Sequence, residues 1–304
     1  MKVWVSGSLA YDRIMDYDGR FSDHLNPKKI HVINLSFAVK NLSLSYGGTA
    51  GNISYNLALL NVPAGVICNL GNDGKDYLKK LRAQKTDLRF IQTFADQFTA
   101  GAYIITDKAD NQITGFYAGA MDNKSLSPKA TAKDLAIVAA DDPTNMARLC
   151  LYYQKTGTPY IYDPGQQITA LSAPYLLQAM RSAWIIIGND YEIDLIFRKT
   201  AYRPSPKQVV VTTFGQKGSS IKTCSAAYKI PIAKPKRTVD PTGAGDAYRA
   251  GLIAGIIKGY DWGKTGRLAS VVAVHAVESL GTQNHFFSWE SLQKRYSRDF
   301  HERL

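Results

Sequence analysis

Two carboxylates and two glycines stand together in the segment Asp240–Asp246, which reads Asp-Pro-Thr-Gly-Ala-Gly-Asp. A helical pattern begins at the end of this segment and runs over residues 246–258. Free backbone amides at a helix start bind anions, and glycines let the backbone close on a phosphate. We therefore expect Gly243, Ala244, Gly245 and Asp246 to hold a transferring phosphoryl group, while the Asp246 carboxylate takes the proton of an attacking hydroxyl. An aspartate that caps an ordinary helix after a glycine turn would give the same pattern.

A second glycine-rich turn, Tyr46–Asn52, also opens a helical pattern. Gly47 and Gly48 allow a ligand to approach the backbone, and Asn52 offers both a donor and an acceptor to vicinal hydroxyl groups. A tight turn before a packed helix is the alternative explanation. No Gly-x-Gly-x-x-Gly pattern follows the first expected strand, which argues against a dinucleotide-binding domain.

Strands and helices must position these residues. Along the chain, short β-branched or aromatic runs alternate with helical patterns, as in a parallel sheet built from βαβ units. The expected strands are Val3–Gly7, Gly65–Leu70, Leu135–Ala139, Tyr160–Tyr162, Trp184–Ile187 and Val209–Thr213. The expected helices are Ala50–Leu60, Gly74–Ala83, Pro143–Lys155, Pro174–Arg181, Glu192–Lys199, Asp246–Lys258, Lys264–Ser279 and Ser288–His301. The fold class is therefore α/β, and we expect one domain over residues 1–304.

Two segments, at about 12–41 and 99–119, do not follow the βα rhythm. Each alternates polar and apolar residues between turn residues, and Asp107–Asn111 has the composition of a hairpin turn. These segments predict a small antiparallel lid outside the main sheet. In a kinase such a lid would exclude water, which competes with the acceptor for the phosphoryl group.

Five motifs in this order resemble those of the ribokinase-like (PfkB) family of carbohydrate and nucleoside kinases, over nearly the whole chain. They are Gly7–Asp12, Gly47–Asn52, Asn189–Glu192, Thr213–Ser219 and Asp240–Asp246. Pro241 stands where many members of the family have threonine, but the side chain at this position is not the base. The resemblance implies a three-layer α/β/α fold with a mostly parallel central sheet.

The same resemblance implies roles for further residues, each at the position that matches a family motif. The acceptor would contact Ser8, Asp12, Gly47, Gly48 and Asn52, and ATP would contact Asn189, Thr213, Gly215, Gly218, Asp240 and Gln283. Asn189 and Glu192 would hold Mg²⁺ through water, and activation by K⁺ is a further expectation from the family.

The block Asp110–Met121 resembles the lid of bacterial adenosine kinases, and so does Gly281–Gln283. Tyr11 and Phe116 could offer aromatic faces to a purine, or they could fill the small core of the lid itself. We therefore expect ATP-dependent phosphorylation of the 5′-hydroxyl of adenosine. Phosphorylation of ribose or another carbohydrate is the alternative, and a catalytically silent ligand-binding member is a weaker one.

The net charge of +12 comes partly from residues 195–239, which hold ten basic residues and no acidic one. A solvated basic face, a positive field that attracts ATP and a nucleic-acid groove are three interpretations, and the last lacks any known motif. No apolar run approaches the roughly 20 residues that span a bilayer, and three scattered cysteines indicate reduced thiols. We expect a cytoplasmic monomer or homodimer that binds neither nucleic acid nor membrane.

Overall fold

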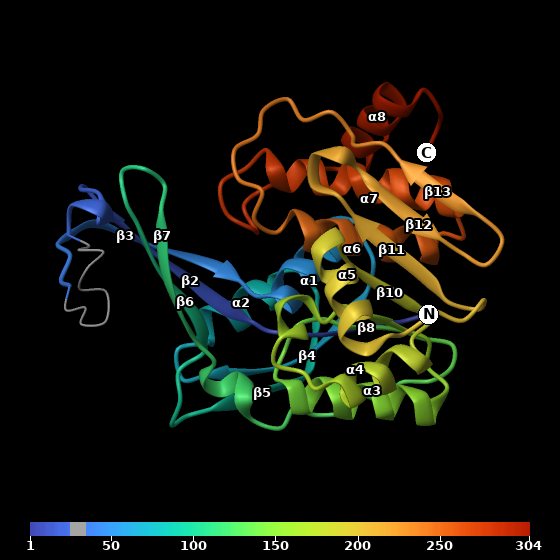
Figure 1. The fold of residues 1–304 in the computed structure, drawn as a ribbon, viewed down its shortest axis with the longest axis horizontal. Coiled ribbons are helices and arrows are strands. Elements are labelled where there is room, and N and C mark those ends of the chain that lie inside the picture. The colour runs from blue at the N-terminus through green and yellow to red at the C-terminus, as the bar shows by residue number, and fades with distance from the viewer. Residues whose placement is uncertain (25–34) are drawn as a thin grey trace.

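The computed structural model describes residues 1–24 and 35–304. A nine-stranded sheet in the order β13-β12-β11-β10-β9-β8-β1-β4-β5 forms its centre (Figure 1). The strands are β1 Val3–Ser6, β4 Ala64–Gly71, β5 Asp87–Phe94, β8 Leu135–Val138, β9 Tyr160–Tyr162, β10 Ile185–Asn189, β11 Val209–Thr213, β12 Ser219–Lys222 and β13 Ala227–Ile230. All adjacent pairs from β11 to β5 are parallel, whereas β12 and β13 add an antiparallel edge.

Helices cover both faces of this sheet, so the central parallel strands are buried on two sides and consist of nearly continuous apolar residues (Figure 1). One layer contains α1 Thr49–Leu59, α2 Lys75–Ala83, α6 Ala244–Ile257, α7 Trp262–Val277 and α8 Trp289–Phe300. The other contains α3 Pro143–Thr156, α4 Ala173–Ser182 and α5 Asp190–Thr200. Short 3₁₀ turns lie at η1 Phe21–Asp23, η3 Gly119–Asp122, η4 Gly165–Ile168 and η5 Gly215–Lys217. The three-layer α/β/α architecture expected from the sequence is confirmed.

A smaller sheet projects from one side of the molecule, at the left of Figure 1. It contains β2 Ala10–Tyr17, β3 Val39–Gly47, β6 Ala100–Thr106 and β7 Gln112–Tyr117 in the order β3-β2-β6-β7. The β2–β3 and β6–β7 pairs are antiparallel, and the β2–β6 pair is parallel. We call this second sheet the lid.

Register in the lid decides which side chains share a face, because residues paired directly across strands point to the same side. One row across the four strands consists of Ser45, Asp12, Ala102 and Phe116. The adjacent row consists of Tyr46, Tyr11, Gly101 and Tyr117 and points to the opposite side. Asp12 and Phe116 therefore lie on one face of the lid, and Tyr11 lies on the other.

The remaining differences from expectation are local. Strands β5, β12 and β13 were not expected, and α5 begins at Asp190 instead of Glu192. Within the lid, the Asp107 carboxylate closes the expected hairpin turn by accepting from the amides of Ala109 at 2.8 Å and Asn111 at 2.9 Å. Part of the predicted lid segment 12–41, residues 25–34, lies outside the described residues. In the described chain no helix is long and apolar enough to cross a membrane.

Candidate active site

The two glycine motifs meet where the carboxyl ends of the parallel strands face the starts of α1 and α6. Asp246 lies in the first turn of α6, and its Oδ2 accepts a hydrogen bond from Asn52 Nδ2 at 2.8 Å. Gly243 precedes the helix with a left-handed φ of 77°, and a Cβ there would lie 2.9 Å from Thr282 Cβ. Both facts require glycine at 243. The structure thus joins two motifs that are 194 residues apart in the sequence.

The surroundings of Asp246 raise the pKa of its carboxyl group to about 7. Burial is the largest cause, and the carboxylates of Asp163 and Glu192 add to it, whereas Arg249 and the hydrogen bond from Asn52 act in the opposite direction. Arg249 is itself buried and donates from Nη2 to Asp163 Oδ1 at 2.6 Å. A carboxyl group that ionises near neutral pH is well matched to general base catalysis.

The amides at the start of α6 differ from one another in what they already bind. Ala244 N donates to Pro241 O at 3.2 Å, whereas the amides of Gly245 and Asp246 have no acceptor within the part of the chain that the structure describes. The expectation that all three amides hold the phosphoryl group is therefore corrected. Two amides are open to an anion, and the third closes the turn before the helix.

A cavity of about 500 Å³ opens beside this helix start. Five of the residues expected around the phosphoryl group and ATP line it, namely Thr213, Gly215, Gly218, Ala244 and Gly245. The cavity is also lined by a stripe of residues on α7, which consists of Ser270, Ala273, Val274 and Val277. The sequence analysis missed this stripe, because small and branched residues at that helical spacing are equally typical of a packed core.

Three residues expected to contact ATP do not line the cavity. Asp240 instead holds the loop 240–243 before α6 in place, because its carboxylate accepts from Thr242 N at 2.9 Å and from Gly281 N at 2.9 Å. Asn189 caps α5 and forms a reciprocal capping box with Glu192, in which each side chain accepts from the other residue's amide at 2.8 Å. The third residue, Gln283, lies on the acceptor side of Asp246.

Gln283 belongs to a directed chain of hydrogen bonds that ends at Asp246. The Tyr77 hydroxyl donates to Gly47 O at 2.6 Å and accepts from Gln283 Nε2 at 2.8 Å. Gln283 Nε2 also donates to Asn52 Oδ1 at 3.0 Å. Because Oδ1 of Asn52 faces this donor, its Nδ2 must face Asp246. Gln283 therefore orients Asn52 and does not contact the nucleotide cavity, and neither this role nor that of Tyr77 has a signal in the residue spacing.

The residues expected to bind the acceptor lie around the ends of β2 and β3. Burial, together with the nearby Asp240 carboxylate, raises the pKa of Asp12 to about 6. A Cβ on Gly47 would lie 2.5 Å from Asp12 Oδ2, and one on Gly48 would lie 2.5 Å from Ser8 O. Gly47 thus keeps space beside Asp12, and Gly48 allows the close approach of the Ser8 backbone. Ser8 is different, because its hydroxyl accepts from Thr49 N at 3.1 Å and caps α1.

The two aromatic residues expected to stack on a purine have opposite surroundings. Tyr11 is 3% exposed, and its ring packs against Tyr46 and Tyr77 at centroid distances of 5.8 Å and 5.6 Å. It therefore offers no open face, which corrects the expectation for Tyr11. The physical reason is strand alternation, since neighbours in a strand cannot both face the ligand. Phe116 is 52% exposed and lies on the face of the lid that carries Asp12.

Known proteins resemble this chain in both sequence and fold. The sequence pattern of the pfkB family of carbohydrate kinases matches residues 2–289. A nucleoside kinase of Methanothermobacter thermautotrophicus is 32% identical over 275 residues, which cover 87% of this chain and 88% of that protein. The structure of Burkholderia thailandensis nucleoside kinase in complex with inosine is 34% identical, with a TM-score of 0.87 and 99% coverage of both chains.

The chain belongs to the PfkB family of ribokinase-like carbohydrate kinases. It is an ATP-dependent kinase that phosphorylates a hydroxyl group of a nucleoside or sugar. A second structure of the Burkholderia kinase, a complex described as ADP-inosine, is 35% identical with a TM-score of 0.85 and covers 99% of this chain and 97% of that one.

Proposed function

We propose that the protein transfers the γ-phosphoryl group of ATP to the 5′-hydroxyl of a nucleoside, with adenosine as the preferred acceptor and Asp246 as general base. The hydrogen bond from Asn52 to Asp246 carries this proposal, because it joins the acceptor side to the open amides beside the 500 Å³ cavity. Asp246 thereby stands between a place for a hydroxyl group and a place for a nucleotide.

The chemistry follows from that position. The Asp246 carboxylate accepts the proton of the 5′-hydroxyl, and the oxygen forms a bond to the γ-phosphorus while the bond to the β–γ bridging oxygen breaks. The products are ADP and a nucleoside 5′-monophosphate. The amides of Gly245 and Asp246 donate to the transferring group, whose charge is spread over its equatorial oxygens.

Asp12 and Asn52 would bind the sugar. Asp12 lies beside the space kept open by Gly47, and its carboxylate can accept from two vicinal hydroxyl groups. Both residues would bind free ribose equally well, so a preference for an acceptor with a nucleobase must come from other residues. Phe116 supports a nucleoside, because it presents an exposed aromatic ring on the Asp12 face of the lid. The two relatives compared above are nucleoside kinases, and one was solved with inosine.

Mg²⁺ would accompany ATP and neutralise phosphate charge. Glu192 fits this role, because its carboxylate lies close enough to influence Asp246 and only one of its oxygens is engaged with the Asn189 amide. No group of three or more His, Cys, Asp or Glu residues that could hold a metal occurs in the described residues. Contact through water, with Asn189 and Glu192 as the anchoring pair, is therefore the arrangement we propose. K⁺ activation remains an expectation from the family.

The test is a panel of acceptors that includes adenosine, inosine, ribose and fructose, with ADP release measured at saturating Mg-ATP. We expect kcat/KM for adenosine to exceed that for ribose by roughly 5–150-fold, which corresponds to about 1–3 kcal/mol of stacking on a base. ³¹P NMR of the product should show a 5′-monoester. If a free sugar is the better acceptor, the nucleoside proposal fails and the kinase assignment stands.

A further inference from the structure

The guanidinium of Arg249 lies beside the start of α6 and is held there by a buried carboxylate. Its Nη2 donates to Asp163 Oδ1 at 2.6 Å, and its Nε donates to Asp163 Oδ2. Asp163 directly follows β9, and the two residues are 2% and 7% exposed for Asp163 and Arg249. Asp163 is the only ion-pair partner of Arg249 among the described residues. The third nitrogen, Nη1, has no acceptor in this part of the chain.

This free nitrogen points back towards the first turn of α6. A Cβ on Gly245 would lie 2.8 Å from Arg249 Nη1. Long side chains on a helix lean towards its N-terminus and cover the residue four positions earlier. Because Gly245 has no side chain, the guanidinium can lie directly over that turn. A buried cation with a free donor is therefore placed beside the residue whose amide is also open.

Around the axis of α6, Arg249 lies between the nucleotide cavity and Asp246. Ala244, Gly245 and Tyr248 line the cavity. Since an α-helix turns by about 100° per residue, Arg249 lies about 40° from Gly245 and about 60° from Asp246, between the two. A phosphoryl group that moves from a nucleotide in the cavity to a hydroxyl group at Asp246 has to pass this part of the helix surface.

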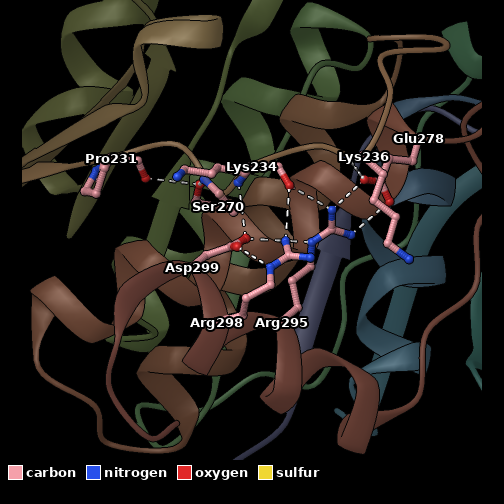
Figure 2. Close-up of polar contacts among 9 residues, drawn as sticks. Pro231, Lys234, Lys236, Ser270, Glu278, Arg295, Arg298 and Asp299 are labelled. Carbon is pink, nitrogen blue, oxygen red and sulfur yellow. Dashed lines mark hydrogen bonds and ion pairs between the residues drawn. The ribbon is translucent and has the colours of Figure 1, made fainter.

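Stability alone does not explain a charged pair at this position, because replacing such a buried pair by apolar residues is often neutral or stabilising. A second buried pair in the same protein differs in one respect. Arg295 of α8 donates from Nη1 to Glu278 Oε2 at 2.9 Å and from Nη2 to Lys234 O at 3.0 Å (Figure 2). Both terminal nitrogens of Arg295 thus have acceptors within the protein, whereas Arg249 leaves one terminal nitrogen for a ligand.

We propose that Arg249 is a further catalytic residue, whose Nη1 donates to a non-bridging oxygen of the transferring phosphoryl group while Asp163 holds the guanidinium in position. This rests on the function proposed above, in which the acceptor oxygen bonds to the γ-phosphorus, the bond to the β–γ bridging oxygen breaks and Asp246 takes the proton. Arg249 keeps its own protons throughout. It supplies positive charge to the phosphoryl oxygens, next to the amides of Gly245 and Asp246.

A second effect of the same charge has to be separated from this one. Arg249 lowers the pKa of Asp246, whereas Asp163 and Glu192 raise it. The remaining polar neighbour is the Asn52 amide, which donates to the same carboxylate. A charge that served only the base would change the pH at which Asp246 ionises and leave turnover above that pH unchanged. A charge that contacts the phosphoryl group affects turnover at every pH.

The test is Arg249→Met combined with Asp163→Asn, which removes the pair without leaving a buried charge unpaired. ADP release is measured against pH at saturating Mg-ATP and acceptor. We expect kcat on the high-pH plateau to fall by roughly 10²–10³-fold, the loss typical of one donor to the transition state, while KM for Mg-ATP changes less than about 3-fold.

Arg295→Met combined with Glu278→Gln is the matched control, because it removes the other buried pair in the same way (Figure 2). Chemical denaturation shows that both double variants are folded, and the control should keep its plateau kcat within about 2-fold of wild type. A plateau kcat near wild type in the Arg249 double variant, with only a displaced pH profile, would overturn the proposal. An equal loss in the control would overturn it too.

The two proposals fail in different measurements. The loss in the Arg249 double variant is measured with adenosine and with ribose, and we expect the same factor for both, because the phosphoryl group is the same. A wrong acceptor therefore shows in the comparison of adenosine with ribose in the wild-type protein, and a wrong base shows in Asp246→Asn. Only the plateau kcat of the Arg249 double variant decides whether Arg249 contacts the phosphoryl group.

Discussion

As the proposed general base, the carboxylate of Asp246 has to be ionised near neutral pH, and its neighbours determine whether it is. Burial raises its pKa, and the Asn52 amide lowers it by donating to Oδ2. The direction of that amide depends on Gln283, whose Nε2 faces Asn52 Oδ1. We therefore propose that Gln283 influences the reaction by orienting the Asn52 amide that donates to Asp246.

Gln283→Glu tests this positioning role, because a carboxylate cannot donate to Asn52 Oδ1. The Asn52 amide should then turn its Nδ2 towards the introduced carboxylate, and Asp246 should lose a donor and gain a negative neighbour. Wild-type kcat/KM should rise with pH through about 7, where Asp246 loses its proton. In the variant this rise should move up by about 1 pH unit, measured as a pH–rate profile with adenosine.

Tyr77→Phe is the matched control for this shift. It removes the hydroxyl that accepts from Gln283 but leaves the donation from Gln283 to Asn52 in place. It should lower stability without moving the pH profile. A wild-type profile in Gln283→Glu would show that Gln283 does not orient Asn52.

At the residue scale, the sequence identified groups whose chemistry shows in a short motif. Gly243, Gly47 and Asn52 are visible in short motifs, because glycine and amide requirements are local, and their roles stay predictions. Gln283 and Asp240 were assigned to ATP from the resemblance, yet their partners are Asn52 and the loop backbone. Such partners come from distant segments, and spacing along the chain does not encode them.

At the scale of elements, the β7 strand gives the lid two chemically different faces. Phe116 shares the face of Asp12, and Tyr117, the next residue, points to the other side with Tyr11. The two aromatic residues have similar exposure, at 52% and 42%. They therefore form a natural pair for separating contact with the acceptor from a general effect of the lid.

Phe116→Ala should lower kcat/KM for adenosine by roughly 5–150-fold, because about 1–3 kcal/mol of stacking is lost. Activity with ribose should stay the same, since ribose has no base to stack. Tyr117→Ala should leave both activities close to wild type. Steady-state kinetics with adenosine and ribose measure these effects. Equal losses of kcat/KM for adenosine in the two variants would show that Phe116 does not contact the acceptor.

Strands could be predicted from the sequence where all of their residues are apolar. The central parallel strands are buried on both faces, so their continuous apolar runs are visible in the sequence. The edge strands β12 and β13 combine buried and exposed positions over four residues each, which gives too short a pattern. In the lid the alternation was visible and already separates Tyr11 from Asp12. The placement of Phe116 on the Asp12 face, by contrast, follows only from the pairing of the strands.

For the molecule as a whole, the burial of the Asp246 carboxylate has a cost in stability. The pKa of Asp246 rises from an ordinary 3.8 to about 7 in the folded state, so the folded state binds the proton more tightly than the unfolded state. The free energy of unfolding therefore falls as pH rises from about 4 to 7, and the full cost is present above pH 7. At 1.36 kcal/mol per pH unit, it amounts to at most about 4 kcal/mol.

Asp246→Asn removes this titration while it keeps the shape of the side chain. The variant should be more stable than wild type at pH 8, and the difference should vanish below about pH 4, where both side chains are neutral. Chemical denaturation at several pH values measures this. A variant that is equally or less stable at pH 8 would mean that the folded protein does not oppose the charge on Asp246.

Turnover by Asp246→Asn tests the central claim most directly, because it removes proton acceptance from the site and little else. ADP release with adenosine and Mg-ATP should fall by roughly 10²–10⁴-fold, with ATP affinity nearly unchanged. Asp240→Asn, which alters a loop carboxylate bonded to the amides of Thr242 and Gly281, serves as the control and should lose much less. Wild-type turnover in Asp246→Asn would contradict the assignment of Asp246 as the base.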